Sequence, residues 1–138
     1  MRLVLDTNIL IAALIKDSIT RRILLLPDLE FLLPAFALDE LARHRVKIVR
    51  AARLKGDELD LLLTLLLTSV AVVPYERIAP YLSDADLLIG AIDPDDILFV
   101  ALALAEDHDG ILSNDRAFKD LPGIQHWTTT SLKTHLRL

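Results

Sequence analysis

Acidic side chains stand at several places in this sequence where they could together bind a divalent metal ion. The stretch Asp93-Pro94-Asp95-Asp96 puts three carboxylates directly before the apolar run ILFVALALA. Asp6 and Asp115 each follow a short apolar run, and Glu40 lies in a segment with helical character. Converging carboxylates raise one another's pKa unless a cation neutralises them, and Mg²⁺ and Mn²⁺ favour such oxygen ligands together with phosphate oxygens. The residue types therefore indicate a metal site able to act on a phosphodiester, and the lack of His or Cys among them makes zinc a poorer choice.

Each of these acids also has a purely structural interpretation. Asp93 can cap a helix that has Pro94 at its first position, with the following acids favoured by the helix dipole. The segment Asp6-Thr7-Asn8 can equally cap a helix, and Ser113-Asn114-Asp115 can form a turn. Glu40 can be an ordinary solvated helix residue. Taken singly, the acids leave both interpretations open, and their convergence in space is what would separate them.

Five short apolar runs alternate with helical segments, which predicts an α/β/α three-layer sandwich around a parallel sheet of about four to five strands. The expected strands are Arg2–Leu5, Glu30–Leu33, Val70–Val73, Ile111–Ser113 and Ile124–Trp127. The expected helices are Ile9–Ile15, Ile19–Leu26, Ala35–Leu54, Asp57–Ser69, one or two within Glu76–Ile89, Pro94–Glu106 and Thr129–Leu136. Ligands bind such sheets at the carboxyl ends of the strands, and the acids map to that edge. We expect a single domain spanning residues 1–138.

The composition and charge of the chain argue against several classes of protein. The formal net charge is −5, which argues against a basic protein that coats nucleic acid, so any nucleic acid would be held by local positive patches or bound cations. The sequence has no cysteine, which excludes disulfides and thiolate metal sites. The apolar stretch Leu59–Val73 is too short to span a bilayer, and Asp6 and Asn8 interrupt the first apolar run, which disfavours a signal peptide. The simplest expectation is a cytoplasmic protein.

Basic residues offer two candidate patches for RNA. Arg43, Lys47 and Arg50 recur at about one turn along the predicted helix that carries Glu40. Arg116, with Lys119 nearby, forms a second patch just after the acid Asp115 in sequence. A solvated face that keeps the helix soluble is the alternative for the first patch.

Four motifs in their order along the chain resemble the PIN-domain ribonucleases, the fold of the VapC-type toxins. They are LVLDTNIL, LLPAFALDEL, DPDDILFVALALA and ILSNDRAF, and the resemblance covers essentially the whole chain. It implies a Mg²⁺- or Mn²⁺-dependent endoribonuclease that hydrolyses phosphodiester bonds. The catalytic and metal-binding quartet that it implies is Asp6, Glu40, Asp96 and Asp115. The supporting residues are Thr7, Asn8, Asp93, Ser113 and Asn114.

The extra acids around Asp96 leave open which of Asp93, Asp95 and Asp96 touches the metal. Helical spacing favours Asp96 as the ligand and Asp93 as the cap. The resemblance further implies a toxin held inactive by a cognate antitoxin protein, and a homodimer. The leucine-rich stretch Leu59–Leu67 is either buried on all sides or contributes a dimer contact.

Three alternatives remain beside the toxin. One is a housekeeping RNA-processing nuclease of the same fold, and another is a non-catalytic module that binds nucleic acid or a partner. A phosphatase is weaker, because Asn8 stands where such enzymes carry a second aspartate two residues after Asp6.

Overall fold

A five-stranded parallel sheet forms the centre of the protein, as expected from the sequence. The computed structural model describes residues 1–138. The strands lie in the order β3-β2-β1-β4-β5, and every neighbouring pair is parallel. Their bounds are β1 Arg2–Leu5, β2 Glu30–Pro34, β3 Val70–Val73, β4 Ile111–Leu112 and β5 His126–Trp127. Two chain segments distant in sequence thus flank β1, with Val4 level with both Leu32 and Ile111.

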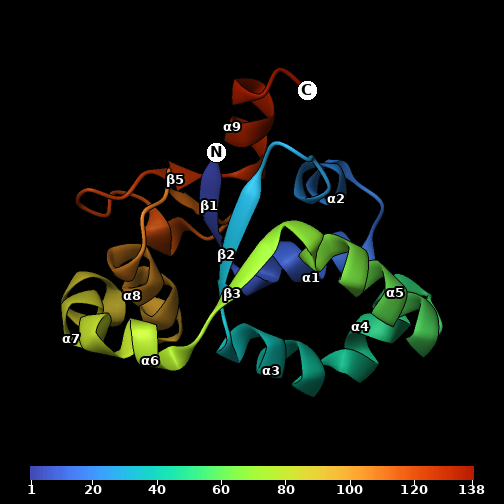
Figure 1. Cartoon of the computed structure of the whole chain (residues 1–138), viewed down its shortest axis with the longest axis horizontal. Helices are drawn as coiled ribbons and strands as arrows, with labels where there is room; N and C mark the ends of the chain where they lie inside the picture. The colour runs from blue at the N-terminus through green and yellow to red at the C-terminus, as the bar shows by residue number, and fades with distance from the viewer.

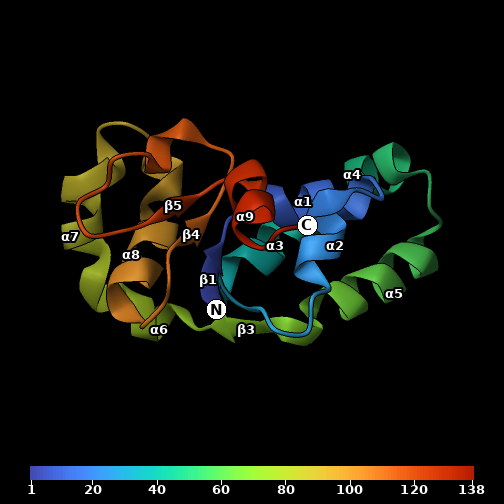
Figure 2. The same cartoon turned by 90° about the horizontal axis from the view of Figure 1, so that it is seen from above.

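Helices cover both faces of the sheet, so the three-layer prediction is confirmed (Figures 1 and 2). One layer contains α1 Thr7–Ile15, α2 Ile19–Leu24, α3 Phe36–Arg43, α4 Arg45–Ala52, α5 Gly56–Leu66 and α9 Thr129–His135. The other contains α6 Tyr75–Ile78, α7 Leu82–Ala85 and α8 Ile97–Ala105. Short turns of tighter or wider helix complete the chain: η1 Leu67–Ser69, η2 Ala79–Tyr81, η3 Asp86–Gly90, η4 Pro94–Asp96 and η5 Arg116–Phe118. No helix in this structure combines the length and hydrophobicity needed to cross a membrane.

The alternation of side chains along β1 divides the interior into two cores. Leu3 and Leu5 pack in the core beneath α1 and its neighbours, whereas Val4 packs in the core that contains α8. All three side chains are fully buried. A strand that is buried on both faces has a continuous apolar sequence. For this reason β1 could be predicted from the sequence.

The prediction of a single helix over Ala35–Leu54 is wrong, because the helix is interrupted at His44 and divides into α3 and α4. His44 has φ −100° and ψ 9°, outside the helical range. Immediately after it, the Arg45 side chain donates a hydrogen bond of 2.9 Å to the Gly56 carbonyl and forms an ion pair with Asp60 on α5. These contacts tie the start of α4 to α5, so tertiary structure overrides a local sequence that contains no helix breaker.

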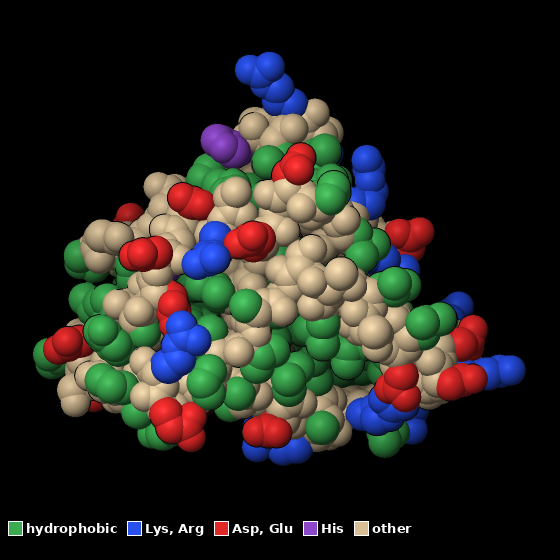
Figure 3. Space-filling model, in the orientation of Figure 1, with side chains coloured by type: hydrophobic (Ala, Val, Ile, Leu, Met, Phe, Trp, Pro, Cys, Tyr) green, Lys and Arg blue, Asp and Glu red, His purple; other side chains and the backbone are tan.

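Helix α5 is not buried on all sides. Leu59 and Leu66 lie in the core, but Leu61 and Leu65 are 64% and 52% exposed. Elsewhere on the molecule, Figure 3 shows hydrophobic side chains gathered at the lower centre, near β3 and α3 and not on α5. An apolar part of the surface is therefore left without a partner in the single chain.

Candidate metal centre

Asp6 is positioned by the end of β1. It is the N-cap of α1, and its Oδ1 accepts a hydrogen bond from the Asn8 backbone N–H at 3.3 Å. Its Oδ2 accepts a second one, from the Ser113 hydroxyl at 2.6 Å, and the residue is only 3% exposed. The sequence suggested either a cap or a site residue here, and the structure shows a cap whose carboxylate also faces the end of β4.

Ser113 connects the ends of β1 and β4. Its side chain is fully buried, and besides donating to Asp6 it accepts a hydrogen bond from the Asp115 backbone N–H at 3.0 Å. Its carbonyl oxygen lies 2.6 Å from His126 Nε2, so that nitrogen carries the proton and donates. One serine therefore fixes the position of Asp6 and the course of the loop that carries Asp115.

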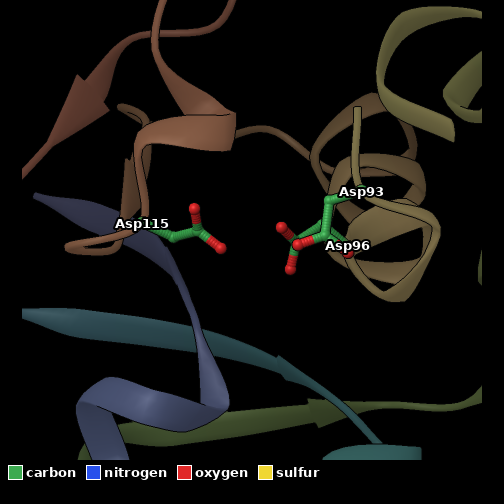
Figure 4. A group of neighbouring side chains, drawn as sticks. All are labelled: Asp93, Asp96 and Asp115. Carbon is green, nitrogen blue, oxygen red and sulfur yellow. The ribbon is translucent and has the colours of Figure 1, made fainter. Parts of the chain in front are cut away.

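Asp93 and Asp96 approach from the start of α8. Asp93 caps the turn η4, accepting a hydrogen bond from the Asp95 backbone N–H at 3.0 Å. Asp96 is 6% exposed, and its Oδ2 is buried without any hydrogen-bond partner. Oxygens of Asp93, Asp96 and Asp115 lie within 4.8 Å of one another, and Figure 4 shows Asp115 facing the other two across the gap between their loops. Asp93 is thus both a cap and a member of the carboxylate group.

Glu40 enters the same region from α3. The Thr7 hydroxyl donates a hydrogen bond to its Oε1 at 3.2 Å. A hollow of about 390 Å³, which we call the acid hollow, brings the elements together. It is lined by Asp6, Thr7, Asn8, Phe36, Glu40, Arg43, Asp93, Asp95, Asp96, Phe99 and Asp115. The four acids proposed from the sequence, scattered over more than a hundred positions, therefore border one space at the carboxyl edge of the sheet.

The electrostatics of the acid hollow favour a cation. Burial first, and then repulsion from Asp93 and Asp115, raises the pKa of Asp96 to about 8. Burial also raises the pKa of Asp6, although the hydrogen bonds from Ser113 and Asn8 partly oppose this. The unpartnered buried oxygen of Asp96 and a donor set made only of carboxylates fit a hard divalent ion such as Mg²⁺ or Mn²⁺.

Some predicted residues lie elsewhere. Arg43 lines the acid hollow, but Lys47 and Arg50 are exposed on α4 and do not, because the break at His44 interrupts the basic stripe. Asn114 turns away from the acids, and its Oδ1 accepts a hydrogen bond from the Thr129 backbone N–H at the start of α9. Arg116 borders a different hollow beside β5.

Two aromatic residues at the site were not singled out from the sequence. Phe36 and Phe99 line the acid hollow with their ring centres 5.5 Å apart, and they form its apolar wall. Phe99 is one helical turn after Asp96 on α8, and this spacing is the signal that could have placed it near the acids.

Comparisons with known proteins agree with this architecture. The sequence model of a family described as the PIN domain matches residues 4–137. A chain in the crystal structure of VapBC2 from Rickettsia felis, bound to a DNA fragment from their promoter, superposes with a TM-score of 0.68. The alignment covers 93% of this chain and 98% of that chain at 19% sequence identity, so it bears on the fold alone. No curated protein matches the sequence at a significant level.

Proposed function

Because the chain belongs to the PIN-domain family of nucleases, we propose that it is a divalent-metal-dependent endoribonuclease. The family resemblance expected from the four sequence motifs is thereby confirmed, while the reaction is our proposal. The observation that carries it is the buried, unpartnered Oδ2 of Asp96, a residue whose carboxylate lies within 4.8 Å of those of Asp93 and Asp115. A buried carboxylate oxygen without a hydrogen bond is costly, and a bound cation removes that cost.

Asp93, Asp96 and Asp115 would hold the ion, with Asp6 and Glu40 bordering the same space. When bound, a divalent cation supplies a Lewis acid that polarises a phosphodiester oxygen and makes a water molecule a stronger nucleophile. This arrangement also supports RNA binding by an acidic chain, because the carboxylates that would repel RNA are neutralised.

The protein's own residues hold the acids ready. Ser113 donates to Asp6, and Thr7 donates to Glu40, so neither carboxylate has to reorganise when a substrate arrives. Arg43 is the one cationic side chain that lines the acid hollow, and we assign it to the substrate phosphate. Lys47, Arg50 and Arg116 lie further out and would contact neighbouring phosphates.

The direct test uses purified protein and a labelled single-stranded RNA, with Mg²⁺ or Mn²⁺ and with or without a chelator. We expect chelator-sensitive cleavage, and we expect Asp6→Asn and Asp96→Asn each to lower kcat/KM by at least about 100-fold. Asp107→Asn is the matched control, because Asp107 is an exposed acid outside the acid hollow. Absence of any chelator-sensitive cleavage by the wild type would favour the non-catalytic binding module.

We further propose that the chain is the toxin of a toxin–antitoxin pair. The proposal is motivated by the similarity in fold to a chain of the VapBC2 complex, and because a housekeeping nuclease would share that fold, a growth assay has to separate the two roles. Induced expression should arrest growth, and co-expression of an adjacent antitoxin gene should relieve the arrest. Arrest by the wild type but not by Asp96→Asn would link the phenotype to the acid hollow. Normal growth on induction would favour the housekeeping enzyme.

A further inference from the structure

A second hollow, which we call the basic hollow, lies beside β5 and has a volume of about 630 Å³. It is lined by Asn114, Arg116, Lys119, Asp120, Ile124, Gln125, His126, Thr128 and Ser131. Only Ile124 among these is hydrophobic. Its size and polar lining suit a nucleotide better than an apolar ligand.

The two hollows meet at one loop. Asp115 lines the acid hollow, whereas its immediate neighbours Asn114 and Arg116 line the basic hollow. This loop is held firmly, because Ser113 fixes its start and Asp115 accepts a hydrogen bond from the Ala117 backbone N–H at 2.9 Å. A nucleic acid chain bound at the carboxylates therefore reaches the basic hollow by passing over this loop at Asp115, which we call the Asp115 rim.

Charge changes sign across that rim. The acid hollow carries six carboxylates and one arginine. In the basic hollow, Arg116 and Lys119 are exposed and take part in no ion pair, and Asp120 is its one carboxylate. Two unpaired cations next to a polyanionic site attract the next phosphate of a nucleic acid strand, because phosphates supply most of the binding energy in such contacts.

The polar walls provide groups that can contact a base or a ribose. Asn114 uses its Oδ1 to bind Thr129, which leaves its amide N–H groups free to donate. Gln125 uses only its amide nitrogen, in a 3.4 Å contact with the His126 carbonyl, so its Oε1 is free to accept. Groups of this kind read the edges of unpaired bases, which are accessible in single-stranded RNA.

We infer that the basic hollow is a subsite for single-stranded RNA: Arg116 and Lys119 bind the phosphate adjacent to the one that lies at the acid hollow. The inference rests on the proposed nuclease function. Efficient cleavage then requires that the substrate extend at least one nucleotide beyond the scissile bond, so that this nucleotide binds in the basic hollow past the Asp115 rim.

The test is the double variant Arg116→Ala/Lys119→Ala, assayed on a single-stranded RNA of about twelve nucleotides. We expect KM to rise about tenfold with kcat unchanged, because the lost contact is equally present in the ground and transition states. Cleavage of a dinucleotide should be unaffected, because its single phosphate cannot occupy both hollows. RNA binding can be measured apart from cleavage with Ca²⁺ in place of Mg²⁺. The slope of log binding constant against log salt should then become shallower by roughly 0.7, for the one phosphate contact that is lost.

Lys16→Ala/Arg22→Ala is the charge-matched control, because both residues are exposed and line neither hollow. Its KM and salt dependence should equal those of the wild type. An unchanged KM and salt dependence in the Arg116→Ala/Lys119→Ala protein, with active wild type, would overturn the subsite. RNA binding that falls only in that double variant, with no cleavage by the wild type, would support the subsite and overturn the proposed nuclease function.

Discussion

Asp96 gives the metal-free protein a distinctive dependence of stability on pH. Burial and neighbouring carboxylates raise its pKa from 3.8 to about 8 in the folded chain. Between these two values the folded state binds the proton more tightly than the unfolded state does. The stabilisation is therefore complete below about pH 4 and is lost as the pH rises through about 8.

We predict that the free energy of unfolding of metal-free protein falls by on the order of 1–3 kcal/mol between about pH 5 and about pH 8. Asp96→Asn should remove most of this dependence, leaving the part due to Asp6, whose pKa burial also raises. It should be the more stable protein at the upper end, because the buried charge at position 96 is gone. Urea unfolding in the presence of a chelator measures the stability of the wild type and of Asp96→Asn at each pH. Added Mg²⁺ should restore the stability at the upper pH in the wild type but not in Asp96→Asn. Asp107→Asn should behave like the wild type, and an identical slope in Asp96→Asn would contradict the assignment.

A second prediction concerns Ser113, whose hydroxyl donates a hydrogen bond to Asp6 and accepts one from the Asp115 backbone N–H. Ser113→Ala leaves the Asp6 carboxylate buried with one hydrogen bond fewer, which we expect to cost about 1–3 kcal/mol of stability. Losing this bond also removes an influence that lowers the pKa of Asp6, so the rate should reach its plateau at higher pH. Chemical unfolding and a pH–rate profile test the two effects. The exposed Ser83→Ala is the control, and a wild-type profile in Ser113→Ala would show that the hydrogen bond is dispensable.

At the level of secondary structure, the pairing of β4 with β5 depends on Gly110, which precedes β4 and has φ +137°. A Cβ at this position would lie 2.5 Å from the Gln125 carbonyl oxygen and 2.8 Å from Trp127 Cδ1. We predict that Gly110→Ala costs about 3 kcal/mol or more, because backbone strain and a clash with backbone coincide. Gly123→Ala is a matched control: its φ is +72° but a Cβ meets nothing within 4 Å, so only about 1 kcal/mol is expected. Equal costs by thermal or urea unfolding would mean that the sheet adjusts around the new methyl group.

The sequence was sufficient for strands with clearly bounded apolar runs and insufficient where tertiary contacts decide. The strands β1 to β3 could be predicted because their apolar runs are bounded by polar or turn residues. The break at His44 could not, since it depends on contacts that Arg45 makes with the next helix, α5. In the site, the strand ends place Asp6 and Asp115 at one edge by topology alone. The second role of Asp93 emerges only when η4 is folded, because a capping side chain keeps one oxygen free to face Asp96.

At the scale of the whole molecule, an apolar surface remains to be covered. Leu61 and Leu65 stand one turn apart on α5 and, with Ile15 from α1, line a shallow hollow of about 440 Å³. Leucines this exposed on a helix whose opposite side enters the core are typical of a contact surface. This supports the homodimer that the leucine-rich stretch suggested.

We predict that the protein dimerises through this face of α5. Leu61→Lys/Leu65→Lys should weaken dimerisation by at least about 100-fold, because two like charges would oppose each other across a two-fold contact. Each monomer should keep its thermal stability within about 0.5 kcal/mol, since both side chains are already largely in solvent. Sedimentation or light scattering over a range of concentrations measures the equilibrium. Leu87→Lys is the control, as Leu87 is 85% exposed on η3 in the opposite helical layer. A wild type that stays monomeric at every concentration, or a dimer untouched by the double substitution, would contradict this prediction. Loss of binding to a co-expressed antitoxin in the double variant, with binding kept in Leu87→Lys, would then assign the surface to the antitoxin.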